Sequence, residues 1–268
     1  MDTERGARKR TVPRRADYGT GLYRRCIVLE SENRLVRAEL ADDFHHFAVE
    51  LEHDGERATR LSGEGVRVPW TTCPGAVLRL RRFEGASLAL SLGELMRFTD
   101  STAQCTHLHD LACLAIAHAE RAKKKGARLR RYDISLPDRT RGASRAILER
   151  DGEILLEWGL KGNRIEDAAP SAFAGLELSG RPFHAFISNE LDPDLAEAAW
   201  VLRRAAFIGD GRVHDFKRIE QASEFAPVVG AACHTFGPDQ VDQARPVHSS
   251  LRDFSSGREG ILDRPDED

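Results

Sequence analysis

Cysteine and histidine side chains gather at four places in the sequence, and these residue types point to a metal site. They stand in the stretches DDFHHF (42–47), PWTTCPGA (69–76), QCTHLHD (104–110) and AACHTFGP (231–238). Zinc and ferrous iron accept thiolate and imidazole ligands, and three protein ligands leave one coordination position open for chemistry. The sequence has no CxxC pair, so the spacing is not that of a zinc finger, and a shared site depends on the fold.

Two of the cysteines precede expected helices. Cys105 stands at the start of an expected helix over 106–125, and Cys73 lies in a Pro-flanked turn before another. Unpaired N–H groups and the helix dipole at such positions favour a thiolate, because they lower the pKa of the thiol. His107 lies in the same first turn as Cys105. The alternative is that Cys105 packs as a small apolar residue beside an exposed His107.

His45 is in phase with Phe47, Val49 and Leu51, which places it at the inward-facing end of an expected strand. His46 then points to the opposite face. An inward histidine is either a metal ligand or a hydrogen-bonded core residue. Cys233 has three open roles, namely a fourth ligand, a proton-transfer group or a buried structural thiol.

The charge, the hydropathy pattern and the cysteine spacing of the chain argue against several classes of protein. The chain has 268 residues and a formal net charge of −3, which argues against a dedicated nucleic-acid-binding protein. It has no apolar run of about 18 residues, as a membrane-spanning helix requires, and the charged N-terminus has no apolar signal segment. Five widely spaced cysteines favour a reducing cytoplasm over a disulfide framework.

The order of elements predicts an α+β fold, with strands in antiparallel meanders instead of alternating singly with helices. Strand patterns run from 22 to 68, and Asp54-Gly55 is typical of a hairpin turn. Helical patterns follow Pro74 and fill 106–125, a second β section runs over 129–187, and a last helix covers 192–209. We expect a disordered basic arm over 1–20, a metal-site core over 21–126, a second α+β section over 127–254 that packs on that core, and a disordered tail over 255–268.

Several motifs resemble a bacterial family that is known only as a domain of unknown function. They are PWTTCPGA and CTHLHDLA, with DDFHHF upstream and EAAWVLRRA and CHTFGP downstream, so the resemblance covers most of residues 20–255. It implies no established chemistry.

The order of elements from about residue 40 to 120 is also distantly similar to NifU-like iron–sulfur scaffold proteins. In that family a strand carries Cys-Gly-Asp, and two further cysteines open later helices. The resemblance implies that His45 matches the metal-contacting Asp, that Cys73 and Cys105 match the second and third cysteines, and that Asp43 replaces the first. With one thiol lost, the resemblance implies retention of a single ion more strongly than assembly of a cluster.

We therefore expect a metal-dependent enzyme that binds one Zn or Fe ion and acts as a Lewis acid in a hydrolysis, lyase or isomerase step on a small organic substrate. The expected ligands are His45, Cys73, Cys105 and Cys233. His107 or His109 is the expected proton shuttle. The alternatives are a non-enzymatic iron, sulfur or metal-cluster carrier, and a metal-free binding module. We expect no nucleic-acid or membrane partner.

Two arginines of the last expected helix are open to more than one interpretation. Arg203 and Arg204 suit either a solvated helix face or the binding of a substrate carboxylate or phosphate. The acidic residues Asp192, Asp194 and Glu197 at the start of this helix are expected to act as caps.

Overall fold

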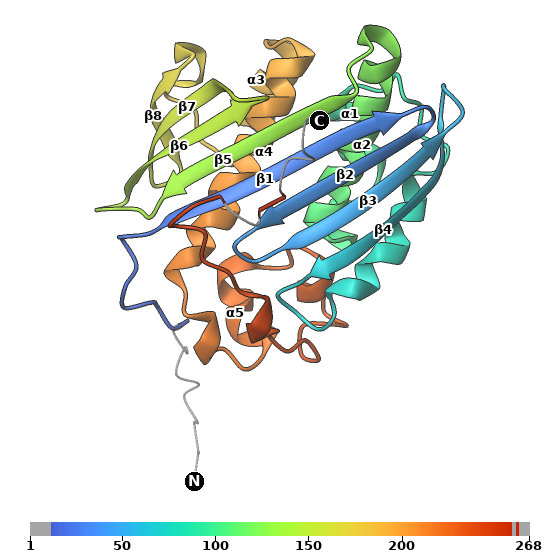
Figure 1. Cartoon of the computed structure of the whole chain (residues 1–268). Helices are drawn as coiled ribbons and strands as arrows, with labels where there is room; N and C mark the ends of the chain where they lie inside the picture. The colour runs from blue at the N-terminus through green and yellow to red at the C-terminus, as the bar shows by residue number, and fades with distance from the viewer. Residues whose placement is uncertain (1–11, 259–260, 263–268) are drawn as a thin grey trace.

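The computed structural model describes residues 12–258 and 261–262, and its centre is one antiparallel sheet of eight strands (Figure 1). The first four strands are β1 (Leu22–Glu32), β2 (Leu35–Asp42), β3 (His46–His53) and β4 (Ala58–Arg67). The second four are β5 (Leu129–Pro137), β6 (Ala143–Arg150), β7 (Glu153–Lys161) and β8 (Arg164–Ala169). Their order in the sheet is β4-β3-β2-β1-β5-β6-β7-β8, so the two halves of the chain share one sheet through the β1–β5 pair.

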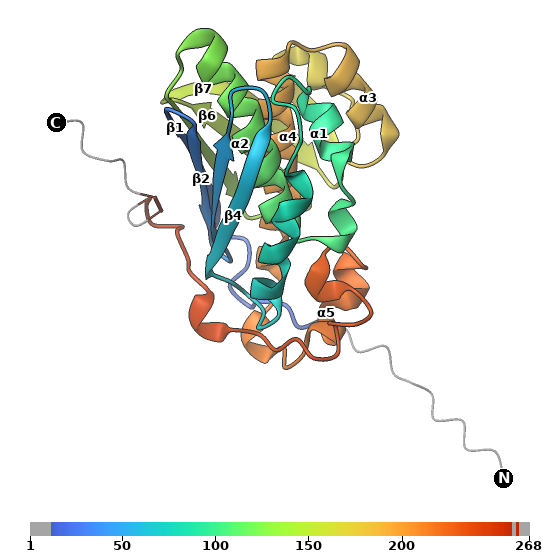
Figure 2. The same cartoon turned by 90° about the vertical axis from the view of Figure 1, so that its right-hand side faces the viewer.

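The helices all lie on one face of this sheet (Figure 2). The helices of the first half are α1 (Leu92–Phe98) and α2 (Thr106–Lys125), preceded by a 3₁₀ segment over Cys73–Phe83. The helices of the second half are α3 (Arg181–Asn189), α4 (Pro193–Gly209) and α5 (Ala222–Val229). α2 packs on β2 and β3, and α4 packs on β5, β6 and β7. Gly209 lets the end of α4 approach the sheet, because a Cβ there would stand 3.0 Å from the Tyr23 ring.

The expected α+β class is confirmed, and two expected helices are found with nearly the expected ends. α2 covers Thr106–Lys125, and α4 begins at Pro193, where the Asp192 side chain accepts from the backbone N–H groups of Asp194 and Leu195. The expected helix after Pro74 is instead a 3₁₀ segment. The second β section was expected to reach residue 187 but ends at Ala169. Residues 181–189 form α3, an amphipathic helix with a proline in its first turn.

The two halves repeat the same plan, a relation not evident in the sequence. Each half has a four-stranded meander followed by a Phe-x-Gly turn and then helices. The turns are Phe83 to Gly85 and Phe173 to Gly175, and both glycines have positive φ, 87° and 90°. In both turns the glycine N–H donates to a carbonyl of the preceding meander, at 2.8 Å for Gly85 and 2.7 Å for Gly175. The shared residues are too few to produce a visible sequence repeat.

Both termini were expected to be disordered, and the parts that the structure describes pack on the domain. Residues 1–11 of the expected arm lie outside the described residues, but the Arg15 N–H donates to the Val213 carbonyl at 3.0 Å, and Tyr18 Oη accepts from the Arg139 N–H at 3.1 Å. Of the expected tail, Ile261 is buried against Cys26 and Ala41 on the face of the sheet opposite the helices. Within the described residues, no helix has the length and apolar character needed to cross a membrane.

A buried ionic cluster joins α2, α4 and β5. Glu197 accepts from Arg121 at 2.6 Å, from Tyr132 Oη at 2.6 Å and from Arg130 at 3.1 Å. Arg121 also donates to Nδ1 of the fully buried His118 at 3.0 Å, which requires a neutral imidazole because arginine has no lone pair to offer. The cluster fixes the helix that begins at the cysteine–histidine motif relative to α4.

We predict that His118 makes the domain sensitive to mild acid. Burial lowers its pKa from 6.5 to about 4, so below pH 6.5 the unfolded chain binds a proton that the folded chain does not. Stability should be complete above pH 6.5 and should fall by roughly 2–3 kcal/mol as the pH drops to 4.5. Urea unfolding of wild type and His118→Gln at several pH values measures this, and the variant should show a flatter profile over that range. Parallel profiles for the two proteins would contradict the prediction.

Candidate functional site

A cavity of about 640 Å³ lies between the β2–β3 turn, the start of α2, the second half of α4 and the α5 region. Most of its wall is aromatic or aliphatic. The aromatic residues that line it are Phe44, Phe47, Trp70, Phe207, Phe216, Phe225 and Phe236. The other lining side chains include three cysteines, three histidines, two arginines and Asp210. A mainly apolar wall that carries polar groups is typical of a small-molecule site.

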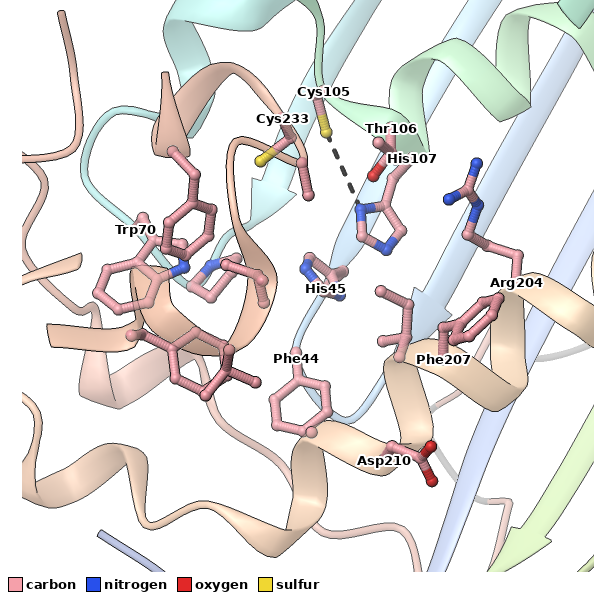
Figure 3. Close-up of a pocket in the computed structure, with 18 of the residues that line it drawn as sticks. Phe44, His45, Trp70, Cys105, Thr106, His107, Arg204, Phe207, Asp210 and Cys233 are labelled. Atoms are coloured by element: carbon pink, nitrogen blue, oxygen red, sulfur yellow. Dashed lines mark hydrogen bonds between the residues drawn. The ribbon is translucent and has the colours of Figure 1, made fainter. Parts of the chain in front are cut away.

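The four expected metal ligands, which are far apart in the sequence, all line this cavity. His45 comes from the β2–β3 turn, Cys73 from the start of the 3₁₀ segment, Cys105 from the N-cap of α2, and Cys233 from the loop after α5. Figure 3 shows the labelled side chains of His45, Cys105 and Cys233, together with His107, around one part of the cavity.

His109 is placed elsewhere. Its ring packs edge-on against Phe83 at 5.3 Å between centroids, and its Nδ1 is 3.9 Å from the sulfur of Cys113. Residues two apart on a helix lie about 200° apart around its axis, so His107 and His109 face different surroundings. His109 does not line the cavity, and the proton-shuttle role expected for it therefore lacks access to the site.

Asp42 holds the β2–β3 turn together. Its Oδ1 accepts from the backbone N–H groups of Phe44 and His45, at 2.8 Å each, and from His45 Nδ1 at 3.0 Å. Its Oδ2 accepts from Tyr23 Oη at 2.8 Å and from Arg25 Nη2 at 2.6 Å. Burial alone would raise the pKa of Asp42, but His45 and Arg25 outweigh it and hold this pKa well below its usual range.

These contacts determine which nitrogen of His45 is free. An ionised carboxylate only accepts hydrogen bonds, so His45 donates to Asp42 through Nδ1–H. Nε2 of neutral His45 then keeps its lone pair, and the side chain lines the cavity. A carboxylate that orients a histidine through its other nitrogen is the usual second shell of a metal-bound imidazole.

The same logic shows that both nitrogens of His107 are occupied. Arg25 Nη2 lies 3.2 Å from His107 Nε2, and an arginine can only donate, so Nε2 accepts. Nδ1 then carries the proton, 4.0 Å from the sulfur of Cys105. Burial, with His45 and Arg25 nearby, holds the pKa of His107 well below 6.5. In this arrangement His107 is a hydrogen-bond donor toward Cys105, and it has no free lone pair for a metal or a substrate proton.

The thiols that line the cavity are neutral at physiological pH. Burial, reinforced by the nearby Cys73 and Cys233, raises the pKa of Cys105 well above 9, although backbone N–H groups at the start of α2 act in the opposite direction. Burial also raises the pKa of Cys73 to about 11 and raises that of Cys233. The lowering expected from the helix N-terminus is thus outweighed by desolvation. Only a positive ligand among these sulfurs would favour the thiolates.

Within the described part of the chain, three residues have possible metal-ligand atoms that all lie within 4.8 Å of one another. They are Asp42, His45 and His107. Arg25 argues against an ion at that point. Its guanidinium already contacts both Asp42 and His107, so an ion there would meet a buried positive charge and occupied lone pairs. Asp42 thus orients His45, and His107 uses a lone pair on Arg25. The other nitrogen of His45 and the three thiols remain as groups that a ligand in the cavity could contact.

Sequence reasoning missed Asp42 and Arg25. The Asp-x-x-His spacing was the available signal for Asp42, because an aspartate commonly accepts from the N–H groups two and three residues later. Asp43, which the NifU-like comparison places at the first cysteine, is instead paired with the buried Arg212. Arg25 carried no local signal, since its partners lie 17 and 82 residues away.

Comparison with known protein families and with curated proteins finds no match to this chain.

We predict that Asp42→Asn destabilises the fold by about 3–5 kcal/mol, because it leaves the buried Arg25 charge without its carboxylate. The free energy of unfolding in urea measures this. Glu50→Gln, on the same sheet but in an exposed pair with Arg37, is the control and should cost at most about 1 kcal/mol. Similar losses in the two variants would show that the Arg25–Asp42 pair does not support the turn.

Proposed function

We propose that the chain is a metal-dependent enzyme that holds one Zn or Fe ion with His45, Cys73 and Cys105, with Cys233 beside the remaining coordination position. The observation that supports this most is the free Nε2 of His45, oriented by Asp42, in the same cavity as three thiols. One imidazole with thiolates is a donor set that zinc and iron accept.

The fit of the ion depends on movement of the cysteine side chains. Among the described residues, the three sulfurs and His45 Nε2 do not form a group within 4.8 Å of one another, so binding requires the thiols to turn toward a common point. Metal binding would also release their protons, since thiolates are the ligands. His107 Nδ1–H is already placed on the side of the Cys105 sulfur, where it would donate to a thiolate.

A bound ion would act as a Lewis acid, which polarises a carbonyl or lowers the pKa of a water molecule. The residues around the ion would orient the ligands and enclose the substrate. Asp42 and Arg25 keep His45 and His107 in fixed tautomers, and the aromatic wall that includes Phe44 and Trp70 excludes water from the bound substrate. The proposed reaction is a hydrolysis, lyase or isomerase step on a small organic substrate.

One observation favours the alternative of a non-enzymatic iron–sulfur or metal-cluster carrier. Cys233 supplies a third thiol near Cys73 and Cys105, where the NifU-like comparison had left only two. The aromatic wall favours the enzyme, because a carrier must present its cluster to a partner. The five free cysteines suit a reducing compartment, and we retain the cytoplasm as the proposed location.

We predict about one Zn or Fe ion per chain in untagged protein, and loss of that ion in both Cys73→Ser and Cys105→Ser. Elemental analysis after anaerobic purification measures both. Cys26→Ala is the matched control, since Cys26 is also buried but lies on the opposite face of the sheet, and it should keep the ion. A wild-type protein that is metal-free and binds neither metal on addition would overturn the proposal. Rapid loss of the ion to a chelator, with a persulfide on a cysteine, would favour the carrier.

A further inference from the structure

Five arginines are buried in the described part of the chain: Arg25, Arg121, Arg130, Arg203 and Arg212. Four of them contact a buried carboxylate. Arg25 pairs with Asp42, Arg121 and Arg130 both pair with Glu197, and Arg212 pairs with Asp43 and Asp138. No carboxylate partner is found for Arg203 among residues 12–258 and 261–262. A buried charge without a partner is costly, so Arg203 is the exception that needs an explanation.

Arg203 is held by aromatic rings. Its guanidinium carbon lies 4.9 Å from the ring centre of Phe207, 5.3 Å from that of Trp200 and 5.5 Å from that of Phe183. Nε donates to the Leu178 carbonyl. Within the described chain, no hydrogen-bond partner is found for its two terminal nitrogens. The rings hold the guanidinium in place, and its terminal nitrogens Nη1 and Nη2 remain able to donate to a further partner.

Arg203 lines the cavity described above, together with Arg204 and Phe207 of α4. Trp200 and Phe183, the other two rings around its guanidinium, do not line the cavity, so Arg203 stands at its edge. The charge of Arg204 is already balanced, since Nε and Nη2 contact the Asp110 carboxylate at 2.6 and 3.2 Å. The charge of Asp110 also acts on Arg203, but its hydrogen bonds go to Arg204, and the Asp210 carboxylate of the same wall is paired with Arg139. Among the described residues, Arg203 is therefore the arginine of this wall that has no carboxylate in hydrogen-bond contact. The nearby His184, whose ring packs on Trp200 at 5.2 Å, brings no negative charge.

We propose that Arg203 binds the carboxylate of a small ligand whose apolar, preferably aromatic, body fills the cavity. This inference rests on the proposed function only in taking the cavity as the substrate site. A carboxylate is favoured over a phosphate because two coplanar oxygens match one free guanidinium edge, and because one arginine without a carboxylate contact matches one negative charge. The aromatic wall matches a flat apolar body.

The test uses benzoate as the probe, with benzamide as its neutral isostere and inorganic phosphate as the competing anion. Binding to the full-length protein is measured by calorimetry at fixed ionic strength. We expect benzoate to bind wild type about 10-fold or more tightly than benzamide or phosphate, and Arg203→Met to lose that preference. Arg145→Met, which removes an exposed arginine on β6, is the matched control and should leave benzoate binding unchanged.

The comparison of benzoate with benzamide needs only wild-type protein, so the inference stays testable if Arg203→Met folds poorly. Equal binding of the two probes, absence of benzoate binding, tighter binding of phosphate, or full benzoate binding by a folded Arg203→Met protein would each overturn it. Cys105→Ser separates the two proposals. If metal-free Cys105→Ser still prefers benzoate, the carboxylate site is supported independently of the metal proposal. If wild type binds the metal but does not prefer benzoate, the carboxylate site alone is rejected.

Discussion

The geometry of the site depends on the ionised carboxylate of Asp42. A buried charge of this kind is tolerated only when its lone pairs are satisfied, and Asp42 receives donors from β1, from the turn that follows it and from the His45 ring. Because the turn N–H groups and the imidazole bind the same oxygen, the backbone of the turn and the orientation of His45 are fixed together. Arg25 extends the constraint to α2 through His107.

This hydrogen-bond network also decides which ring nitrogens of His45 and His107 keep a free lone pair. His107 uses its lone pair on Arg25, whereas His45 donates to Asp42 and keeps its own on the cavity side. Two histidines with ring centres 3.9 Å apart thus have different chemical capacities, and the difference follows from which partner is a cation and which is an anion. Desolvation keeps the thiols neutral. A cation bound in the cavity would lower the pKa of the thiols, and deprotonation of the thiols would in turn strengthen binding of the cation.

The sequence predicted elements whose signals are local. The apolar stripe and the Gly126 end of α2, and the phase of His45 with Phe47, required only neighbours along the chain. Interactions between segments that are distant in the sequence could not be predicted. Asp194 and Glu197 look like helix-capping acids, but they bind arginines of α2 and β5, and nothing near them in the sequence indicates that pairing. The convergence of Cys105 with Cys233 likewise required the complete fold.

The two halves of the repeated architecture differ in the connection that lines the cavity. Both halves build the same meander and Phe-x-Gly turn, but the β6–β7 connection is a tight hairpin through Asp151 and Gly152, both at positive φ. The corresponding β2–β3 connection is longer and places His45 at the cavity. The second half contributes α4 to the opposite wall instead, with Arg203 among its aromatic neighbours. One half therefore supplies the imidazole, two of the thiols and part of the aromatic wall, including Phe44 and Trp70. The other half supplies Arg203 and the rest of that wall, so the cavity is enclosed only because both halves share one sheet.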